Sequence, residues 1–180
     1  MKTILIGLAF ISFSNFVHSQ TPETSTNRVK LDEVIISPIK NVSYYKAVYD
    51  PYAAKGVKDL ETIVAKHDVS ASDVYGNYDS YMFIFKNSVG KIVTMYDKDG
   101  ELLTSIEKFK DIQLPEKVRL ALLSKYPGWG LNSTVFRVKY AHNKDVEKAY
   151  YLQIQKGTDK LNVKVNCDGD VLKSGCFASL

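Results

Sequence analysis

A pattern of one helix followed by several strands occurs twice in this chain, and the strands of the second copy match those of the first at an offset of 69 residues. In each copy, apolar residues at helical spacing precede short segments that alternate apolar and polar residues, as strands do. Each copy also has an Asp-Gly step, which is typical of a hairpin turn. A fixed offset indicates a duplicated unit, with coincidence between two meanders as the alternative. The matched positions are Tyr81 with Tyr150, Phe83 with Leu152, Phe85 with Ile154, Lys91 with Lys160, Ile92 with Leu161, Thr94 with Val163, Tyr96 with Val165, Asp99-Gly100 with Asp168-Gly169, Leu103 with Leu172 and Ser105 with Ser174.

Two repeat units account for most of the chain. The first spans residues 53–110 and the second spans 111–180, after an N-terminal leader at 20–52. We expect an α+β fold, a tandem repeat in which each unit packs one helix on a small antiparallel sheet. Whether both units share one sheet stays open. The expected helices are 53–67 and one from Leu114-Pro115 to Pro127-Gly128, and the expected strands are 81–86, 91–96, 101–110, 134–140, 146–155, 160–166 and 170–173.

The first 19 residues have the features of a secretory signal peptide. Met1-Lys2 supplies a positive start, residues 3–16 are mostly apolar, and Val17-His18-Ser19 resembles a cleavage site. The alternative is a transmembrane anchor, but the apolar run is shorter than the ~20 residues that span a bilayer. We therefore predict an exported chain, periplasmic or extracellular, that is cleaved between Ser19 and Gln20 and does not span a membrane.

The leader carries one strand-like segment and one segment rich in tyrosine. Residues 29–37 (VKLDEVIIS) have the composition of a strand, which ends at Pro38. Residues 41–52 contain four tyrosines and show no clear period. The sequence therefore predicts no regular element over 41–52.

The chain has two cysteines, Cys167 and Cys176. In an exported protein they are candidates for a disulfide, with two reduced thiols as the alternative. The predicted hairpin register does not place them opposite each other, so a bridge requires the C-terminal tail to fold back. Two cysteines without a histidine cluster do not make a structural zinc site.

The second unit carries a short motif that resembles a known family. Its helix runs from Leu114-Pro115 through Val118 and Leu122 to Tyr126-Pro127-Gly128-Trp129, and strands and the Asp168-Gly169 turn follow. This pattern resembles the PepSY-like family, also described as β-lactamase-inhibitor-protein-like (BLIP-like), of small secreted proteins in Bacteroidetes-type bacteria. The resemblance covers residues 114–173 and, less closely, 58–107. It implies a helix-and-sheet unit that is often duplicated, and a role in binding or inhibiting another protein.

The motifs of common enzyme classes are missing from the sequence. It has no G-x-G-x-x-G or G-x-x-x-x-G-K-[ST] phosphate loop, no G-x-S-x-G elbow and no H-E-x-x-H motif. The run from Asp97 to Glu101 is acidic, but it lacks the further ligands of an EF-type calcium loop and fits a charged hairpin turn. We therefore predict no catalytic residue, no cofactor and no metal. The alternative is an enzyme whose site assembles in space from His67, His142, Asp97, Asp99 and the tyrosine-rich segment.

Alternation along the strands separates two faces of the sheet in the second unit. One face is apolar and should pack on the helix, whereas the other is polar and basic, as a solvated face is. The predicted inner residues are Phe136, Val138, Tyr140, Tyr150, Leu152, Ile154, Leu161, Val163 and Val165, and the predicted outer residues are Arg137, Lys139, Tyr151, Gln153, Asn162 and Lys164.

The first unit differs, because its outer face is apolar. The shared offset places Tyr81, Phe83, Phe85, Ile92, Thr94 and Tyr96 inside. The outer residues are then Met82, Ile84, Val93 and Met95. Exposed apolar patches are rare in stable monomers, so something should cover these side chains. One candidate for their cover is the chain itself, through Val34-Ile35-Ile36 or the tyrosine-rich segment. The other is a partner, whose binding surface would extend over Arg137, Lys139 and Tyr151 if the two sheets are contiguous.

The function that fits these patterns best is an exported binding module without catalytic activity, which presents a sheet face to another protein or an envelope ligand. An enzyme with an assembled site and an envelope structural protein without a specific ligand are the alternatives. The formal net charge of +4 is small and its charges are spread along the chain. Nucleic acid is therefore not predicted as a partner.

Overall fold

The computed structural model of this chain describes residues 38–175, which belong to one unit of the chain, Ile36–Leu180. Three predictions concern residues outside that range: the signal peptide at 1–19, the strand-like segment at 29–37, and Cys176. The disulfide between Cys167 and Cys176 therefore stays a prediction.

The predicted order of helices and strands is present, together with an α-helix and a 3-10 helix that were not predicted. Both predicted helices and all seven predicted strands form, with small shifts of their ends. The elements in chain order are α1 (Val42–Val48), α2 (Lys55–Lys66), a 3-10 helix η1 (Val69–Ala71), β1 (Ser80–Lys86), β2 (Gly90–Asp97), β3 (Leu102–Lys110), α3 (Glu116–Lys125), β4 (Gly130–Ala141), β5 (Glu147–Lys156), β6 (Asp159–Val165) and β7 (Val171–Gly175).

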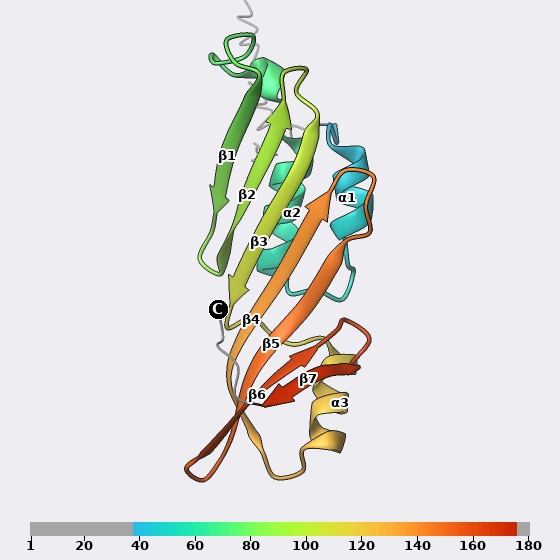
Figure 1. Cartoon of the computed structure of the whole chain (residues 1–180), viewed down its shortest axis with the longest axis vertical. Coiled ribbons are helices and arrows are strands. Elements are labelled where there is room, and N and C mark those ends of the chain that lie inside the picture. The colour runs from blue at the N-terminus through green and yellow to red at the C-terminus, as the bar shows by residue number, and fades with distance from the viewer. Residues whose placement is uncertain (1–37, 176–180) are drawn as a thin grey trace, which may run out of the picture. The chain divides into compact units, whose positions relative to one another are not determined.

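The seven strands form one antiparallel sheet, in which each strand pairs with the next one along the chain. The two predicted meanders are therefore contiguous, and β3 joins them by pairing with β4. Figure 1 shows α1 and α2 behind the sheet, on the face turned away from the viewer, while α3 lies near β7. The turn before β7 comes close to α3, since a Cβ at Gly169 would lie 3.0 Å from the Lys117 carbonyl oxygen. The fold is thus α+β, with its helices packed on an antiparallel sheet.

The strand pairing of β1–β3 recurs in β5–β7 at the same 69-residue offset. The same β-bulge and the same left-handed turn glycine occur in both places. Strand β4 has no counterpart at this offset, because residues 61–72, which lie 69 positions earlier, include the end of α2 and η1. The recurring features are the pairs Tyr81–Tyr96 and Tyr150–Val165, the bulges at Met95/Tyr96 and Lys164/Val165, and the positive φ of Gly100 (82°) and Gly169 (96°).

The inner face of the sheet and the helices enclose one hydrophobic core. The predicted inner residues of the second unit are buried, except Leu161, which is half-buried. Aromatic rings stack across the strands, with 4.4 Å between the ring centroids of Phe136 and Tyr150 and 6.3 Å between those of Phe109 and Phe136. Val118 and Leu122 bring α3 into the same core. The inner and outer assignments made from alternation are therefore confirmed.

Helix α1 corrects the prediction that residues 41–52 hold no regular element. Its core contacts come from Tyr44 and Val48, which are four residues apart and share one helix face. The Tyr44 ring meets the Tyr140 ring edge-on, with 5.4 Å between centroids. A helix of seven residues with two buried positions is too short to show a helical period in the sequence.

The position of α1 also corrects one candidate for covering the apolar outer residues. The tyrosine-rich segment packs on the inner face, because Tyr44 lies in the core and the Tyr44 hydroxyl donates to Glu107 at 2.8 Å. It therefore cannot cover Met82 and its neighbours on the opposite face. The other candidate, Val34-Ile35-Ile36, lies outside the described residues.

Candidate functional site

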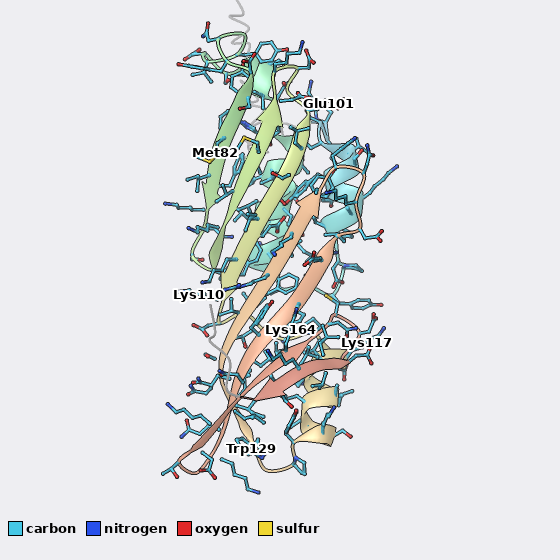
Figure 2. All side chains as sticks on the ribbon, viewed as in Figure 1. Met82, Glu101, Lys110, Lys117, Trp129 and Lys164 are labelled. Atoms are coloured by element: carbon cyan, nitrogen blue, oxygen red, sulfur yellow. The ribbon has the colours of Figure 1, made fainter. Side chains whose placement is uncertain are left out.

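The residues predicted as a binding surface all lie on the outer face of the sheet. Met82, Ile84, Val93 and Met95 come from β1 and β2, and Arg137, Lys139 and Tyr151 come from β4 and β5. The continuous sheet places both groups on one surface, since the β3–β4 pairing keeps the outer positions aligned. Figure 2 shows this face, with Met82 on β1 and Lys110 and Lys164 farther along the sheet.

The apolar part of this surface, here called the apolar patch, comprises Met82, Ile84, Val93, Met95 and Ile106. Met82 pairs with Met95, and the adjacent row runs from Ile84 through Val93 to Ile106. Met82 is 62% exposed, Ile84 52% and Ile106 61%. These side chains therefore present one connected aliphatic surface to solvent.

Ile106 is a member of this patch that the sequence analysis missed. The signal was weak because the inner positions of β3 include the polar residues Ser105 and Glu107. Alternation from Phe109 would have placed Ile106 outside, since the two positions differ by an odd number of residues.

A row of four cations crosses the sheet beside the apolar patch. Lys86 pairs with Lys91, Lys91 with Lys108, and Lys108 with Arg137, so one cation stands on each of β1 to β4. We call these four residues the cation row. Burial together with the charges of Arg137, Lys110 and Lys91 lowers the pKa of the Lys108 ammonium. Among the four, the sequence analysis identified only Arg137, because strand pairing and not sequence spacing brings them together.

Arg137 and Tyr151 form the far end of this surface. The Arg137 guanidinium carbon lies 4.9 Å from the centre of the Tyr151 ring, and the Lys164 ammonium lies 5.4 Å from the same centre. The Tyr151 ring attracts both cations. Lys164 therefore extends the positive surface onto β6.

Two carboxyl groups are buried between the helices and the sheet. Glu61 on α2 and Glu107 on β3 are each 1% exposed. The Glu107 Oε1 atom accepts hydrogen bonds from the Tyr44 hydroxyl at 2.8 Å and the Ser105 hydroxyl at 3.0 Å. Burial raises the pKa of Glu61 to about 9, with further raising by Glu107, and raises the pKa of Glu107 to about 7. Both carboxyl groups are closed off from solvent. Their shifted pKa values therefore affect the pH dependence of the free energy of unfolding.

A cavity of about 220 Å³ brings His67 and His142 together, near the Lys40–Asp68 ion pair of 2.8 Å. The His67 ring packs against Phe83 with 4.5 Å between centroids, and burial lowers the pKa of His67. His67, His142 and Tyr44 of the tyrosine-rich segment, all proposed for an enzyme, thus line one cavity. Gly100 and Glu101 of the β2–β3 turn line it too, whereas Asp97 and Asp99 do not.

The turn explains the acidic run that resembled a calcium loop. The Asp97 Oδ1 atom accepts backbone N–H groups from Asp99 at 3.0 Å and from Glu101 at 2.9 Å. Asn166 makes the same two bonds in the second unit, to Asp168 at 3.1 Å and Asp170 at 2.7 Å. Within residues 38–175, no three His, Cys, Asp or Glu side chains are grouped to hold a metal ion.

A second groove, of about 580 Å³, lies between the α1–α2 loop and α3 and includes Tyr49, Tyr52, Leu120, Lys148 and Cys167. Burial raises the pKa of the Cys167 thiol to about 11, which makes it a weak nucleophile at neutral pH.

In the part of the chain that the structure describes, no helix is long and apolar enough to cross a bilayer.

Comparison with known proteins finds similar structures but no matching sequence. No family model and no curated protein matches this chain. A BLIP-like protein from Bacteroides fragilis is 15% identical, over 72% of this chain and 89% of its own, with a TM-score of 0.35. A candidate periplasmic protein from Bacteroides eggerthii is 13% identical, over 69% of this chain and 88% of its own, with a TM-score of 0.35. A DUF2874 family protein from Bacteroides ovatus is 13% identical, over 54% of this chain and 69% of its own, with a TM-score of 0.34.

One of these structures is described as BLIP-like, which agrees with the BLIP-like part of the predicted resemblance. The PepSY-like part stays a prediction. With TM-scores of 0.34 and 0.35, the likeness says nothing about the surface described above or about what this chain binds.

Proposed function

We propose that this chain is an exported binding module without catalytic activity, and that the outer face of its sheet binds another protein. The observation that carries the proposal is the apolar patch, because five connected aliphatic side chains stand on a sheet face opposite the core. Covering one such side chain stabilises a complex by about 1–2 kcal/mol. A patch of this kind marks an interaction site more often than a random surface does.

The composition of the outer face supports a protein partner. Protein interfaces are enriched in Met, Tyr and Arg at their centre and carry polar residues at the rim. The patch contributes Met82 and Met95, and Arg137 and Tyr151 stand farther along the same surface in contact with each other. A partner that covered both groups would cover five strands, β1 to β5, of one continuous sheet.

Export is part of the same proposal and rests on the residues of the signal-like segment at 1–19. We also infer that the two units are copies of one ancestral helix-and-meander unit. The matched register, bulge and turn glycine of the strands at one offset support this inference.

The first test is capture of a partner by the chain that begins at Gln20. Wild-type protein and the Met82→Glu/Met95→Glu variant are immobilised, incubated with envelope extract and culture fluid of the source organism, and compared by quantitative mass spectrometry. We expect one protein to be enriched on the wild type and lost on the variant, because a charge in the patch stays unpaired in the interface.

A matched control makes the result specific to the outer face. The Ile63→Glu/Leu123→Glu variant carries the same kind of change at two exposed apolar residues on α2 and α3. It should capture the partner as the wild type does. Equal capture by the wild type and the patch variant would reject the outer face. A patch variant that unfolds would show the patch to be core.

The cavity that holds His67 and His142 supports a second candidate, a small-molecule or catalytic site. If the wild type captures no protein at any salt concentration, this cavity becomes the place to study. A thermal-shift screen with metabolites on the wild type and the His67→Ala/His142→Ala variant would then test it.

A further inference from the structure

We propose that the partner of the outer face is a protein with a carboxylate-rich strip beside an apolar patch, and that the cation row binds that strip. The inference rests on the proposed function, since it names the chemistry of the partner at the same surface. It goes further because it specifies which charge the partner carries and where on the sheet that charge lies.

The cation row places like charges directly opposite each other on neighbouring strands. Lys86 faces Lys91, Lys91 faces Lys108, and Lys108 faces Arg137. Neighbouring strands lie about 4.8 Å apart, and like charges in directly opposed positions destabilise a sheet. The free protein therefore carries a repulsion that bound anions would relieve.

The outer face around the cation row carries a surplus of positive charge. Two carboxylates stand at outer positions of the described strands, and both have other contacts. Glu147 pairs with Lys139, and Asp97 accepts a backbone hydrogen bond within the β2–β3 turn. The cations at outer positions are Lys86, Lys91, Lys108, Lys110, Arg137, Lys139, Lys160, Lys164 and Lys173. The surface is thus complementary to an anionic partner.

The apolar patch and the cation row are adjacent on the outer face. Ile84, Val93 and Ile106 stand two residues along the strand from Lys86, Lys91 and Lys108, respectively, and therefore on the same face. A ligand that covers one row reaches the other. Such a ligand has an apolar centre and a line of anions beside it, which is a feature of protein surfaces and not of polysaccharides or nucleic acids.

The fixed placement of the charges favours a protein over an anionic bilayer. Lys108 and Arg137 are half-buried, and the Arg137 guanidinium carbon lies 4.9 Å from the centre of the Tyr151 ring. A protein partner can place its carboxylates to match cations held at set positions, whereas the headgroups of a bilayer are mobile.

The test uses two labelled peptides of about twelve residues, long enough to cross four strands. In one peptide Glu alternates with Leu and Val, and in the other Gln replaces every Glu. Binding to the full chain from Gln20 is measured by fluorescence anisotropy at low and physiological salt. Vesicles of phosphatidylglycerol and inorganic polyphosphate serve as the competing anionic probes.

We expect the Glu peptide to bind the wild type about tenfold or more tightly than the Gln peptide, and to bind less tightly as salt rises. The Lys86→Glu/Lys91→Glu variant should lose about tenfold or more in affinity for the Glu peptide. The Arg137→Gln variant provides a second, milder test of the same row. The matched control, Lys46→Glu/Lys125→Glu on α1 and α3, should bind as the wild type does.

Three results would overturn the inference: equal binding of the two peptides, equal binding of the Glu peptide by wild type and cation-row variants, or binding of vesicles or polyphosphate without binding of the peptide. They are separable from failure of the proposed function. If the Met82→Glu/Met95→Glu variant loses a captured protein while the cation-row variants retain it, the binding module stands and the acidic partner does not. Circular dichroism of each variant confirms that it is folded.

Discussion

At the scale of single residues, the least usual feature is the buried pair Glu61 and Glu107. Glu61 lies in the apolar stripe of α2 with Leu60 and Val64, so the helix period itself carries a carboxyl into the core. Nearby Lys148 opposes the effect of burial and lowers the pKa of both carboxyls, but burial is the larger cause. Both groups therefore keep their protons to higher pH in the folded chain than in the unfolded chain.

This pair predicts that the protein is more stable in acid than in base. Because the folded pKa values of Glu61 and Glu107, about 9 and about 7, exceed the ordinary value near 4.5, the folded state holds protons that the unfolded state releases. The stabilisation is complete below about pH 4.5, and it declines as pH rises through 7 towards 9. Urea unfolding at several pH values measures this decline.

The Glu61→Gln variant tests the cause of that decline. Glutamine keeps the shape of the protonated acid and cannot ionise, so the variant should be more stable than the wild type at pH 9 by roughly 1–3 kcal/mol. Its free energy of unfolding should also depend less on pH. Glu116→Gln at an exposed position on α3 is the control and should follow the wild type. A wild-type protein with constant stability from pH 4.5 to 9 would contradict the assignment.

At the scale of elements, the cation row makes a prediction about the free protein. Lys91→Glu turns two repulsive cross-strand pairs, with Lys86 and Lys108, into attractive ones. The variant should be more stable than the wild type by roughly 0.5–1.5 kcal/mol, and the difference should shrink at high salt. Thermal unfolding at two salt concentrations checks this. A less stable variant would mean that Lys91 has a stabilising role in the sheet.

The elements also show what sequence patterns can and cannot predict. Met82, Ile84, Val93 and Met95 were placed outside by the 69-residue offset, which transferred the inner and outer positions of the second unit to strands that are apolar on both faces. Helix α1 escaped prediction, since only Tyr44 and Val48 face the core. The cation row escaped too, since its members belong to four strands and only the pairing register aligns them.

At the scale of the whole described unit, the sheet and core are continuous. Strand β3 joins the two meanders through its pairing with β4, and residues of α1, α2 and α3 share one hydrophobic core. The repeat expected from the sequence left open whether the two units share one sheet, because each expected unit contains its own helix and strands. Sequence alone could not decide between one sheet and two, as the pairing of β3 with β4 leaves no local pattern.

This continuity predicts that the chain unfolds in one cooperative transition. A break between the two halves would expose the core side of both β3 and β4, so neither half is expected to melt alone. Calorimetry of the chain from Gln20 should give a van't Hoff enthalpy equal to the calorimetric enthalpy. Two resolved transitions would show that the halves are independent.

The open order of the sheet has a consequence for solubility. Among the described strands, β1 has a neighbour on one side only, and its central run Tyr81 to Phe85 is uncharged, aromatic-rich and free of proline. Such a run at a sheet edge is the kind of template on which further chains stack into fibrils. Lys86 ends the run with a charge, as gatekeeper residues do. Lys86 therefore has a second effect besides its place in the cation row, because its charge disfavours stacking of β1 on other copies of the chain.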